Sequence, residues 1–283
     1  MSTNPNAMTF GKKPQGGFRE PMPLTDLLEP AVAEGPLPVG NWSPSRLLDW
    51  LLCPARGAWS CGVWELPAEF EWPANPDAQV GVATHRYAEA RLNGASVDEA
   101  RIAGADAALD TDPEEWLPLT DLWETAIRPA IGTPQATEQR LVLTLDGLPV
   151  TCVLDVIDEV GTIRDLKTTK RKPNPIDIAR KSLQAPLYVA AWRQETGEAA
   201  PFVLDYLIRN KTPQALTLPV PVTEASIDRA RRQLSWAQEQ ADNPDSIVPN
   251  PYTAYGCTGC PFVRVCADQW GFPHPETVTA EAP

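Results

Sequence analysis

No stretch of this sequence stays apolar for long enough to cross a lipid bilayer. A membrane-spanning helix needs about 18–20 consecutive apolar residues, and every apolar run here is shorter. The sequence also lacks the basic segment followed by an apolar one that marks a secretory signal. We therefore expect a soluble, cytoplasmic protein, in a bacterium or in a phage-infected host cell, with no membrane partner.

Cysteine is scarce for a protein held together by disulfides. The 283 residues contain six cysteines, whereas secreted scaffolds of that kind are dense in cysteine. Cys257, Cys260 and Cys266 form the pattern C-x2-C-x5-C, a spacing that indicates a metal site.

Three thiolates are one fewer than the usual four of an iron–sulfur cluster or a structural zinc ion. Cys53, Cys61 and Cys152 are the candidates for the fourth. Cys152 lies in an apolar strand pattern, which favours a place in the core. Spacing alone does not decide between Cys53 and Cys61.

Lys and Arg are also fewer than Asp and Glu in this sequence. The formal net charge of -13 argues against a protein that coats nucleic acid in general. The charge is unevenly distributed, however, because residues 161–232 hold 13 Lys and Arg against 7 Asp and Glu. A local basic surface can therefore exist on an acidic protein.

The length and an apolar fraction of 43% fit one large domain or two small ones. Residues 1–40 are rich in Pro, Gly and Ala and predict a disordered tail, and residues 271–283 a flexible one. Helical spacing of apolar residues predicts helices over 43–53, 77–92, 98–109, 114–131, 176–195 and 224–241. Alternating patterns predict strands over 137–145, 150–160, 163–168, 202–209 and 215–220.

The stretch 153–168, VLDVIDEVGTIRDLKT, predicts two strands joined by a turn at Gly161. Asp155 lies on the first strand, while Asp165 and Lys167 are two apart on the second and share one face. Two carboxylates brought together by a hairpin beside a lysine can hold a hard divalent cation and a polarised water. The alternative interpretation is a solvated strand face with ordinary charges.

Two helices contribute further candidates. His85 lies within the helix predicted over 77–92, where a single histidine is more often structural than a ligand. Gln184 and Tyr188 are one turn apart in the helix predicted over 176–195, so they share a face.

These features follow one another in an order that resembles the RecB-like branch of the PD-(D/E)XK nuclease superfamily. The likeness is to its iron–sulfur members, such as CRISPR-associated exonucleases and the AddB nuclease domain, and it runs from about Ser43 to Cys266. It rests on SPSRLLDWLLCP, GVATH, Glu138, the stretch LDVIDEVGTIRDLKT, QAPLY and the C-x2-C-x5-C pattern.

The resemblance implies a role for each matching residue. His85, Asp155 and Asp165 would be ligands of Mg²⁺ or Mn²⁺, and Lys167 would orient the attacking water and stabilise charge on the phosphate. Gln184 and Tyr188 would help to place the DNA strand, and Glu138 would support the site. The four ligands of a [4Fe–4S] cluster would be Cys53, Cys257, Cys260 and Cys266, with a structural Zn²⁺ as the alternative.

The fold implied is an α/β (α+β) restriction-endonuclease-like one, a mixed central sheet flanked by helices, with a helical insertion and an Fe–S clasp that joins the N- and C-terminal segments. The nuclease domain would span 41–270, with a helical part at 77–131, a catalytic core at 137–220 and the cysteine clasp at 257–266.

The expected function is a metal-dependent DNA exonuclease that acts at DNA ends or on single strands in recombination, repair or phage DNA processing, with a possible helicase or recombinase partner. Two alternatives remain: a non-catalytic module that binds DNA ends or a partner and keeps the nuclease fold, and a metal-stapled interaction protein with no nucleic-acid role.

Overall fold

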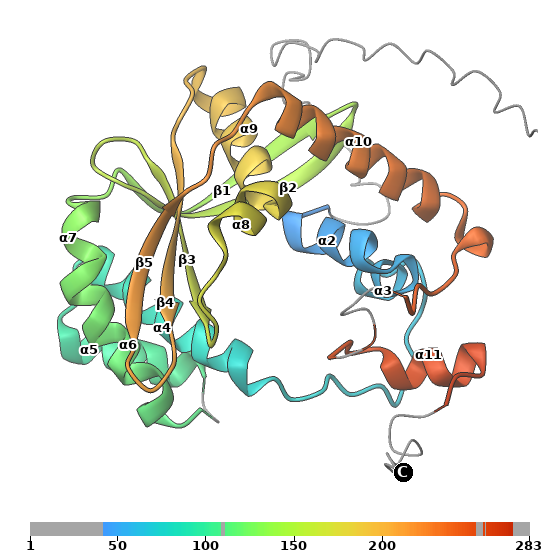
Figure 1. The fold of residues 1–283 in the computed structure, drawn as a ribbon, viewed down its shortest axis with the longest axis horizontal. Coiled ribbons are helices and arrows are strands. Elements are labelled where there is room, and N and C mark those ends of the chain that lie inside the picture. Colours follow the sequence, from blue (N-terminus) through green and yellow to red (C-terminus); the bar gives the residue numbers. More distant parts are fainter. Residues whose placement is uncertain (1–41, 109–110, 253–256, 258, 274–283) are drawn as a thin grey trace, which may run out of the picture.

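A mixed five-stranded β-sheet forms the centre of the structure (Figure 1). The computed structural model describes residues 42–108, 111–252, 257 and 259–273. The strands are β1 (Ala136–Leu145), β2 (Leu148–Ile157), β3 (Ile163–Thr169), β4 (Phe202–Ile208) and β5 (Gln214–Pro219). They are hydrogen-bonded in the order β1-β2-β3-β4-β5, and β3–β4 is the parallel pair. The predicted mixed α/β fold with a central sheet is confirmed. The tails predicted over 1–40 and 271–283 lie outside the described residues, apart from residues 271–273.

A two-residue turn sets the register of the first hairpin. Asp146 and Gly147 have φ values of 50° and 76°, the left-handed pair that a type I′ turn requires. Leu145 consequently pairs with Leu148, and the ladder continues to Ala136 and Ile157. This Asp-Gly turn determines which β2 side chains reach which face of the sheet.

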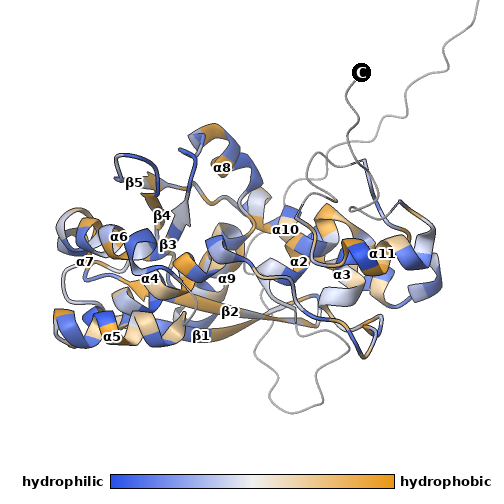
Figure 2. Ribbon diagram, turned by 90° about the horizontal axis from the view of Figure 1, so that it is seen from below, coloured by the Kyte–Doolittle hydropathy of each residue, from blue (hydrophilic) through white to orange (hydrophobic). Residues whose placement is uncertain are grey.

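Helices cover both faces of the sheet. Successive residues of β4 alternate between two hydrophobic clusters, because neighbouring strand residues point to opposite faces: Leu204 and Ile208 belong to one and Leu207 to the other. The first cluster includes α2 (Pro44–Leu52), α3 (Pro54–Ser60), α9 (Gln184–Thr196) and α10 (Glu224–Ala241). The second includes α4 (Pro76–Leu92), α5 (Val97–Ala107), α6 (Pro113–Ala126) and α7 (Arg128–Ile131). Figure 2 shows β1 and β2 largely hydrophobic, with hydrophilic residues on the surrounding helices.

Proline divides two helices that the sequence predicts as continuous. The helix expected over 114–131 ends at Ala126, and α7 begins anew with Pro129 in its first turn. The helix expected over 176–195 is α8 (Pro175–Lys181) followed by α9. The break at Ser182 lies four residues before Pro186, which has no N–H to donate to the Ser182 carbonyl.

The remaining helical segments are η1 (Pro244–Ser246) and α11 (Val263–Trp270). Residues 62–75 contain no helix or strand. The cap of α5 is Ser96, which forms a reciprocal capping box with Glu99. None of the described helices is long and apolar enough to span a membrane.

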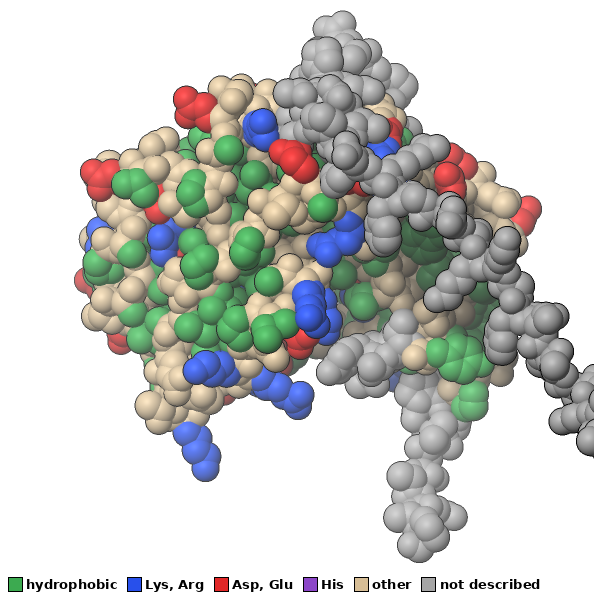
Figure 3. Space-filling view, turned by 45° about the horizontal axis from the view of Figure 1, so that its top comes forward, with side chains coloured by type: hydrophobic (Ala, Val, Ile, Leu, Met, Phe, Trp, Pro, Cys, Tyr) green, Lys and Arg blue, Asp and Glu red, His purple; other side chains and the backbone are tan. Residues whose placement is uncertain are grey.

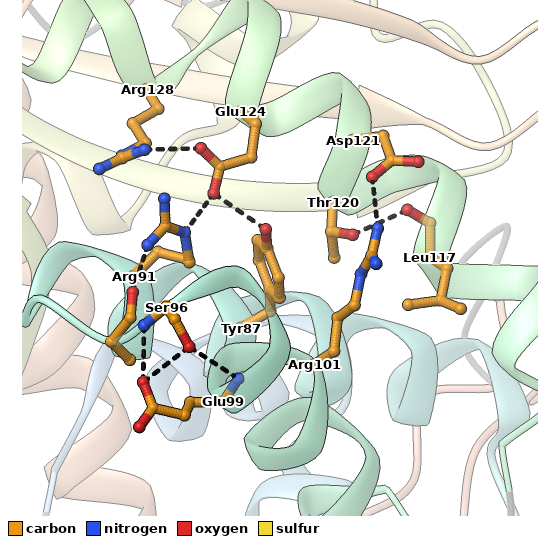
Figure 4. A network of polar contacts seen from close by, with 11 residues as sticks. Tyr87, Arg91, Ser96, Glu99, Arg101, Leu117, Thr120, Asp121, Glu124 and Arg128 are labelled. Atoms are coloured by element: carbon orange, nitrogen blue, oxygen red, sulfur yellow. Dashed lines mark hydrogen bonds and ion pairs between the residues drawn. The ribbon is translucent and has the colours of Figure 1, made fainter.

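A polar network ties α4 to α6 (Figure 4). The Glu124 carboxylate accepts hydrogen bonds from the Tyr87 hydroxyl at 2.9 Å, from Arg91 Nε at 2.5 Å and from Arg128 at 2.7 Å. Burial raises the pKa of Glu124, but these three hydrogen bonds outweigh it and hold the pKa below its usual value. A carboxyl with a lowered pKa stabilises the fold above its unfolded pKa, and that contribution is lost as the pH falls through the folded pKa.

We expect Glu124→Gln to lower the free energy of unfolding by about 1–3 kcal/mol at neutral pH, since a charged hydrogen-bond acceptor is lost. The difference from the wild type should shrink from neutral to acidic pH, as the pH falls through the lowered pKa of Glu124 and the carboxylate itself becomes protonated. Urea denaturation at both pH values measures it. Asp121→Asn is the matched control, because Asp121 forms an ion pair with Arg101 in which the two side chains are 67% and 41% exposed. The network has no stabilising role if both variants behave alike.

Candidate active site

Strands β2 and β3 are hydrogen-bonded at two residue pairs and then separate. The pairs are Val156 with Arg164 and Ile157 with Ile163, after which β3 continues beside β4. Where the strands separate, the backbone N–H of Leu166 donates to Asp155 Oδ2 at 2.9 Å. At the opening of the sheet, the Asp155 carboxylate thus accepts a hydrogen bond from β3 in place of a backbone carbonyl of a paired strand.

Asp165 is the buried centre of this opening. Its side chain is 1% exposed, and its Oδ2 lies 2.6 Å from Lys167 Nζ. Its Oδ1 accepts a hydrogen bond from Gln184 Nε2 at 3.0 Å. Burial raises the pKa of Asp165 to about 6, the Asp155 carboxylate adds to this rise, and Lys167 opposes it. A buried carboxylate whose proton affinity is raised by a neighbouring carboxylate is a group that a cation stabilises.

His85 reaches the site because α4 lies unusually close to β3. Gly81 is one helical turn before His85, and a Cβ at Gly81 would meet Thr168 Oγ1 at 3.2 Å. The absent side chain permits this approach. His85 Nδ1 then lies 3.4 Å from Asp155 Oδ2.

Glu138 has a backbone conformation that is rare for a residue with a side chain. Its φ is 47°, in the left-handed region that costs a non-glycine residue about 1–2 kcal/mol. Its β1 neighbours pair with Val156 and Leu154, so Glu138 lies opposite Asp155. Burial raises the pKa of Glu138, and the carboxylates of Asp155 and Glu89 raise it further. Strain and charge repulsion therefore coincide at this glutamate.

Gln184 and Tyr188 lie on one face of α9, as their spacing predicts. Gln184 Nε2 lies 3.1 Å from the Tyr188 hydroxyl as well as near Asp165. Tyr188 is buried, and burial together with the Asp165 charge raises the pKa of its phenol. The pair holds the buried carboxylate from the side opposite α4.

A cavity of about 620 Å³ opens onto this group. Its lining includes His85, Glu138, Asp155 and Lys167. Carboxylate oxygens with one imidazole form a donor set that suits Mg²⁺ or Mn²⁺.

Buried Asp165 Oδ2 makes no hydrogen bond of acceptable geometry within the described chain, despite its closeness to Lys167. An oxygen of this kind fits a cation, so the residues fit the metal that the resemblance implies. Across the part of the chain that the structure describes, however, no three His, Cys, Asp or Glu side chains converge as a complete metal-binding group.

Four of the six cysteines line a cavity of about 180 Å³ that is separate from the active site, the cysteine cavity. They are Cys53, Cys257, Cys260 and Cys266. Burial raises the pKa of Cys266 to about 11, and the other three cysteines add to the rise. Cys61 is absent from this lining and accepts a hydrogen bond from Trp50 Nε1 at 3.3 Å. Between the two candidates that spacing left open, the structure therefore places Cys53 with the C-terminal cysteines.

Tyr206 lies beside the site and was not among the predicted residues. In the parallel register of β3 and β4 it is the partner of Lys167. A tyrosine in an apolar strand predicts a core position, and no local signal shows the register of two strands that are joined through two helices.

Comparisons with known proteins bear on the fold and the family of this chain. No curated protein matches the chain. A solved structure of the protein SSO0001 is 14% identical and covers 66% of this chain and 83% of its own, but its TM-score of 0.34 is too low to bear on the fold.

The crystal structure of a candidate exonuclease from Eubacterium rectale is 16% identical, with a TM-score of 0.53 over 78% of this chain and 87% of that one. At this identity the likeness concerns the fold alone. The family model of the PD-(D/E)XK nuclease superfamily matches residues 41–267. The chain therefore belongs to the PD-(D/E)XK nuclease superfamily.

Proposed function

We propose that this nuclease is a Mg²⁺- or Mn²⁺-dependent DNA exonuclease that hydrolyses phosphodiester bonds at DNA ends or in single strands. The observation that carries the proposal is that two pairs of side chains, His85 with Asp155 and Lys167 with Asp165, lie where β2 and β3 separate. These residues come from three elements, and their side chains are the types that phosphodiester hydrolysis needs.

His85, Asp155 and Asp165 would hold the metal, with Glu138 supporting the site, and the metal would supply Lewis-acid polarisation of the phosphate and a water of lowered pKa. Lys167 has a different role. Its side chain is 36% exposed and its ammonium lies against Asp165, so it offers a positive charge to the scissile phosphate. Gln184 donates to Asp165 Oδ1 and so restricts the carboxylate to one orientation.

DNA contact has to rest on a local surface, because the chain as a whole is acidic. Figure 3 shows Lys and Arg side chains along one edge of the molecule and at the rim of a hollow in the face that is seen. Phosphate contacts of this kind position a strand without reading its sequence. We place the activity in recombination, repair or phage DNA processing in the cytoplasm, with a helicase or recombinase as the kind of partner that such an enzyme serves.

We also propose that Cys53, Cys257, Cys260 and Cys266 hold a [4Fe–4S] cluster. The shared cavity supports this, as does the number of thiols, which matches a Cys₄ ligand set. A cluster there would join a segment close to α2 to the segment before α11, closing a long loop of chain. A structural zinc ion is the competing occupant.

Asp165→Asn and Lys167→Ala should each reduce Mg²⁺-dependent degradation of linear DNA at least about a hundred-fold, since the first removes a charged metal ligand and the second removes the positive charge beside the scissile phosphate. Release of acid-soluble nucleotides from single-stranded and duplex DNA measures the loss, and circular dichroism checks the fold. Wild-type protein that binds labelled DNA but does not cleave it in Mn²⁺ would instead support the non-catalytic module. Full activity in either variant contradicts the assigned site.

Glu138→Gly and Glu138→Gln should both lower activity, but only the glycine relieves the left-handed backbone. Relief of about 1–2 kcal/mol, less the roughly 0.5–1 kcal/mol that glycine's flexibility costs, gives a free energy of unfolding that is unchanged or raised by about 1 kcal/mol. Chemical denaturation of both variants tests this. A glycine variant clearly less stable than the glutamine variant shows that Glu138 is not strained.

Anaerobically purified protein should absorb visible light and contain about four iron atoms per chain. Cys53→Ser should lose iron and colour, whereas Cys61→Ser, just outside the cavity, should keep both. Iron and zinc assays on the three proteins decide the matter. Colourless protein with about one zinc ion identifies the competing occupant, and metal retained by Cys53→Ser removes Cys53 from the ligand set.

A further inference from the structure

A second cavity, of about 520 Å³, adjoins the active site on the side of Lys167 that faces α2 and α8. Lys167 lines both this cavity and the metal-side cavity. A phosphate bound beside Lys167 would therefore lie between the two cavities, and the DNA strand that carries this phosphate could extend into either of them.

The two cavities differ in charge. The metal-side cavity includes four carboxylates, those of Asp77, Glu89, Glu138 and Asp155. The second cavity has none among its lining residues and offers hydroxyl and ammonium donors instead. These donors belong to Ser43, Ser45, Thr151, Lys181, Ser182 and Tyr206. An anionic strand is repelled by the first lining and attracted by the second.

Of these residues, Tyr206 gives the strongest evidence that the cavity binds a ligand. Its side chain lines the cavity although the residue is only 8% exposed. Register places it directly beside Lys167 on the same face of the sheet. Its hydroxyl makes no hydrogen bond to any described residue and is not among the fully buried polar atoms without a partner, so it is open to the cavity and free to donate there. A ligand in the cavity would supply that partner.

We propose that this cavity binds one nucleotide of a single DNA strand next to the scissile phosphate, and that the Tyr206 hydroxyl donates a hydrogen bond to it. The inference rests on the proposed nuclease function and adds its substrate subsite. The apolar part of the lining, which includes Leu48 and Ile178, contacts the sugar and base, while the donors contact phosphate oxygens.

The size of the cavity favours a single strand over a duplex. At about 520 Å³ it lies in the range of small-molecule sites, roughly 300–1,000 Å³, which suits one nucleotide and not a base pair with both backbones. A paired end would have to unpair before its terminal nucleotide could enter. Single-stranded ends are therefore the preferred substrates.

The test uses Tyr206→Phe, which removes the hydroxyl and keeps the ring that packs in the sheet. We expect KM for a single-stranded oligonucleotide to rise roughly ten- to a hundred-fold, as loss of a hydrogen bond to a charged group predicts. Hydrolysis of the small diester bis(p-nitrophenyl) phosphate should fall much less, because it offers neither a sugar nor a base to the cavity. Tyr252→Phe is the matched control, since Tyr252 is 93% exposed. An unaltered KM in Tyr206→Phe overturns the role of the hydroxyl.

A second variant tests the cavity itself. Ser45 is exposed on α2 and lines the cavity, so Ser45→Trp should fold and obstruct it. Cleavage of single-stranded DNA should fall at least ten-fold while hydrolysis of the small diester persists. Full cleavage by Ser45→Trp, or equal wild-type rates on single-stranded and blunt duplex ends, refutes the subsite. Wild-type protein inactive on both DNA and the small diester contradicts the nuclease function instead, so the two failures can be told apart.

Discussion

The burial of the Asp165 carboxylate is the constraint on which the rest of the site depends. A carboxylate that is 1% exposed and near a second one is costly unless charge and hydrogen bonds compensate it. Three elements supply the compensation: β3 through Lys167, α9 through Gln184, and α4 through His85 beside Asp155. The active-site geometry therefore requires both helical layers to be docked on the sheet.

The opposite side of β3 is held by a second buried charge group. Arg164 donates to Asp205 at 2.8 and 3.0 Å and to Asp158 at 3.3 Å. All three are nearly inaccessible to solvent. Removing one partner of such a group leaves an uncompensated buried charge and costs about 3–5 kcal/mol. The group anchors β3 to β4 and to the turn after β2, and so keeps the opening between β2 and β3 in place.

The ends of the described chain meet at the cysteine cavity. Aromatic packing brings them together, since the rings of Trp59 and Phe262 are 5.5 Å apart and those of Phe70 and Phe262 are 5.7 Å apart. Figure 1 shows α11 next to α3, far from the helices α4–α7. Helix α2, which ends beside Cys53, also lines the cavity proposed for the nucleotide, so a cluster or ion held by the four thiols would stabilise one wall of that cavity.

Local signals in the sequence determined much of the fold. The Asp-Gly turn, the alternating strands, the prolines at helix starts and the spacing of Gln184 and Tyr188 all act over a few residues, and so they could be read directly. The hairpin likewise predicted that Asp155 and Asp165 lie near each other. Other features depend on contacts between distant segments: the closeness of α4 to β3 at Gly81, the left-handed Glu138, the choice of Cys53 over Cys61, and the place of Tyr206 beside Lys167. Only the tertiary structure decided these. The register of a parallel strand pair and the docking of a helix result from packing between segments that are far apart in the sequence, and no local pattern of residues shows such packing.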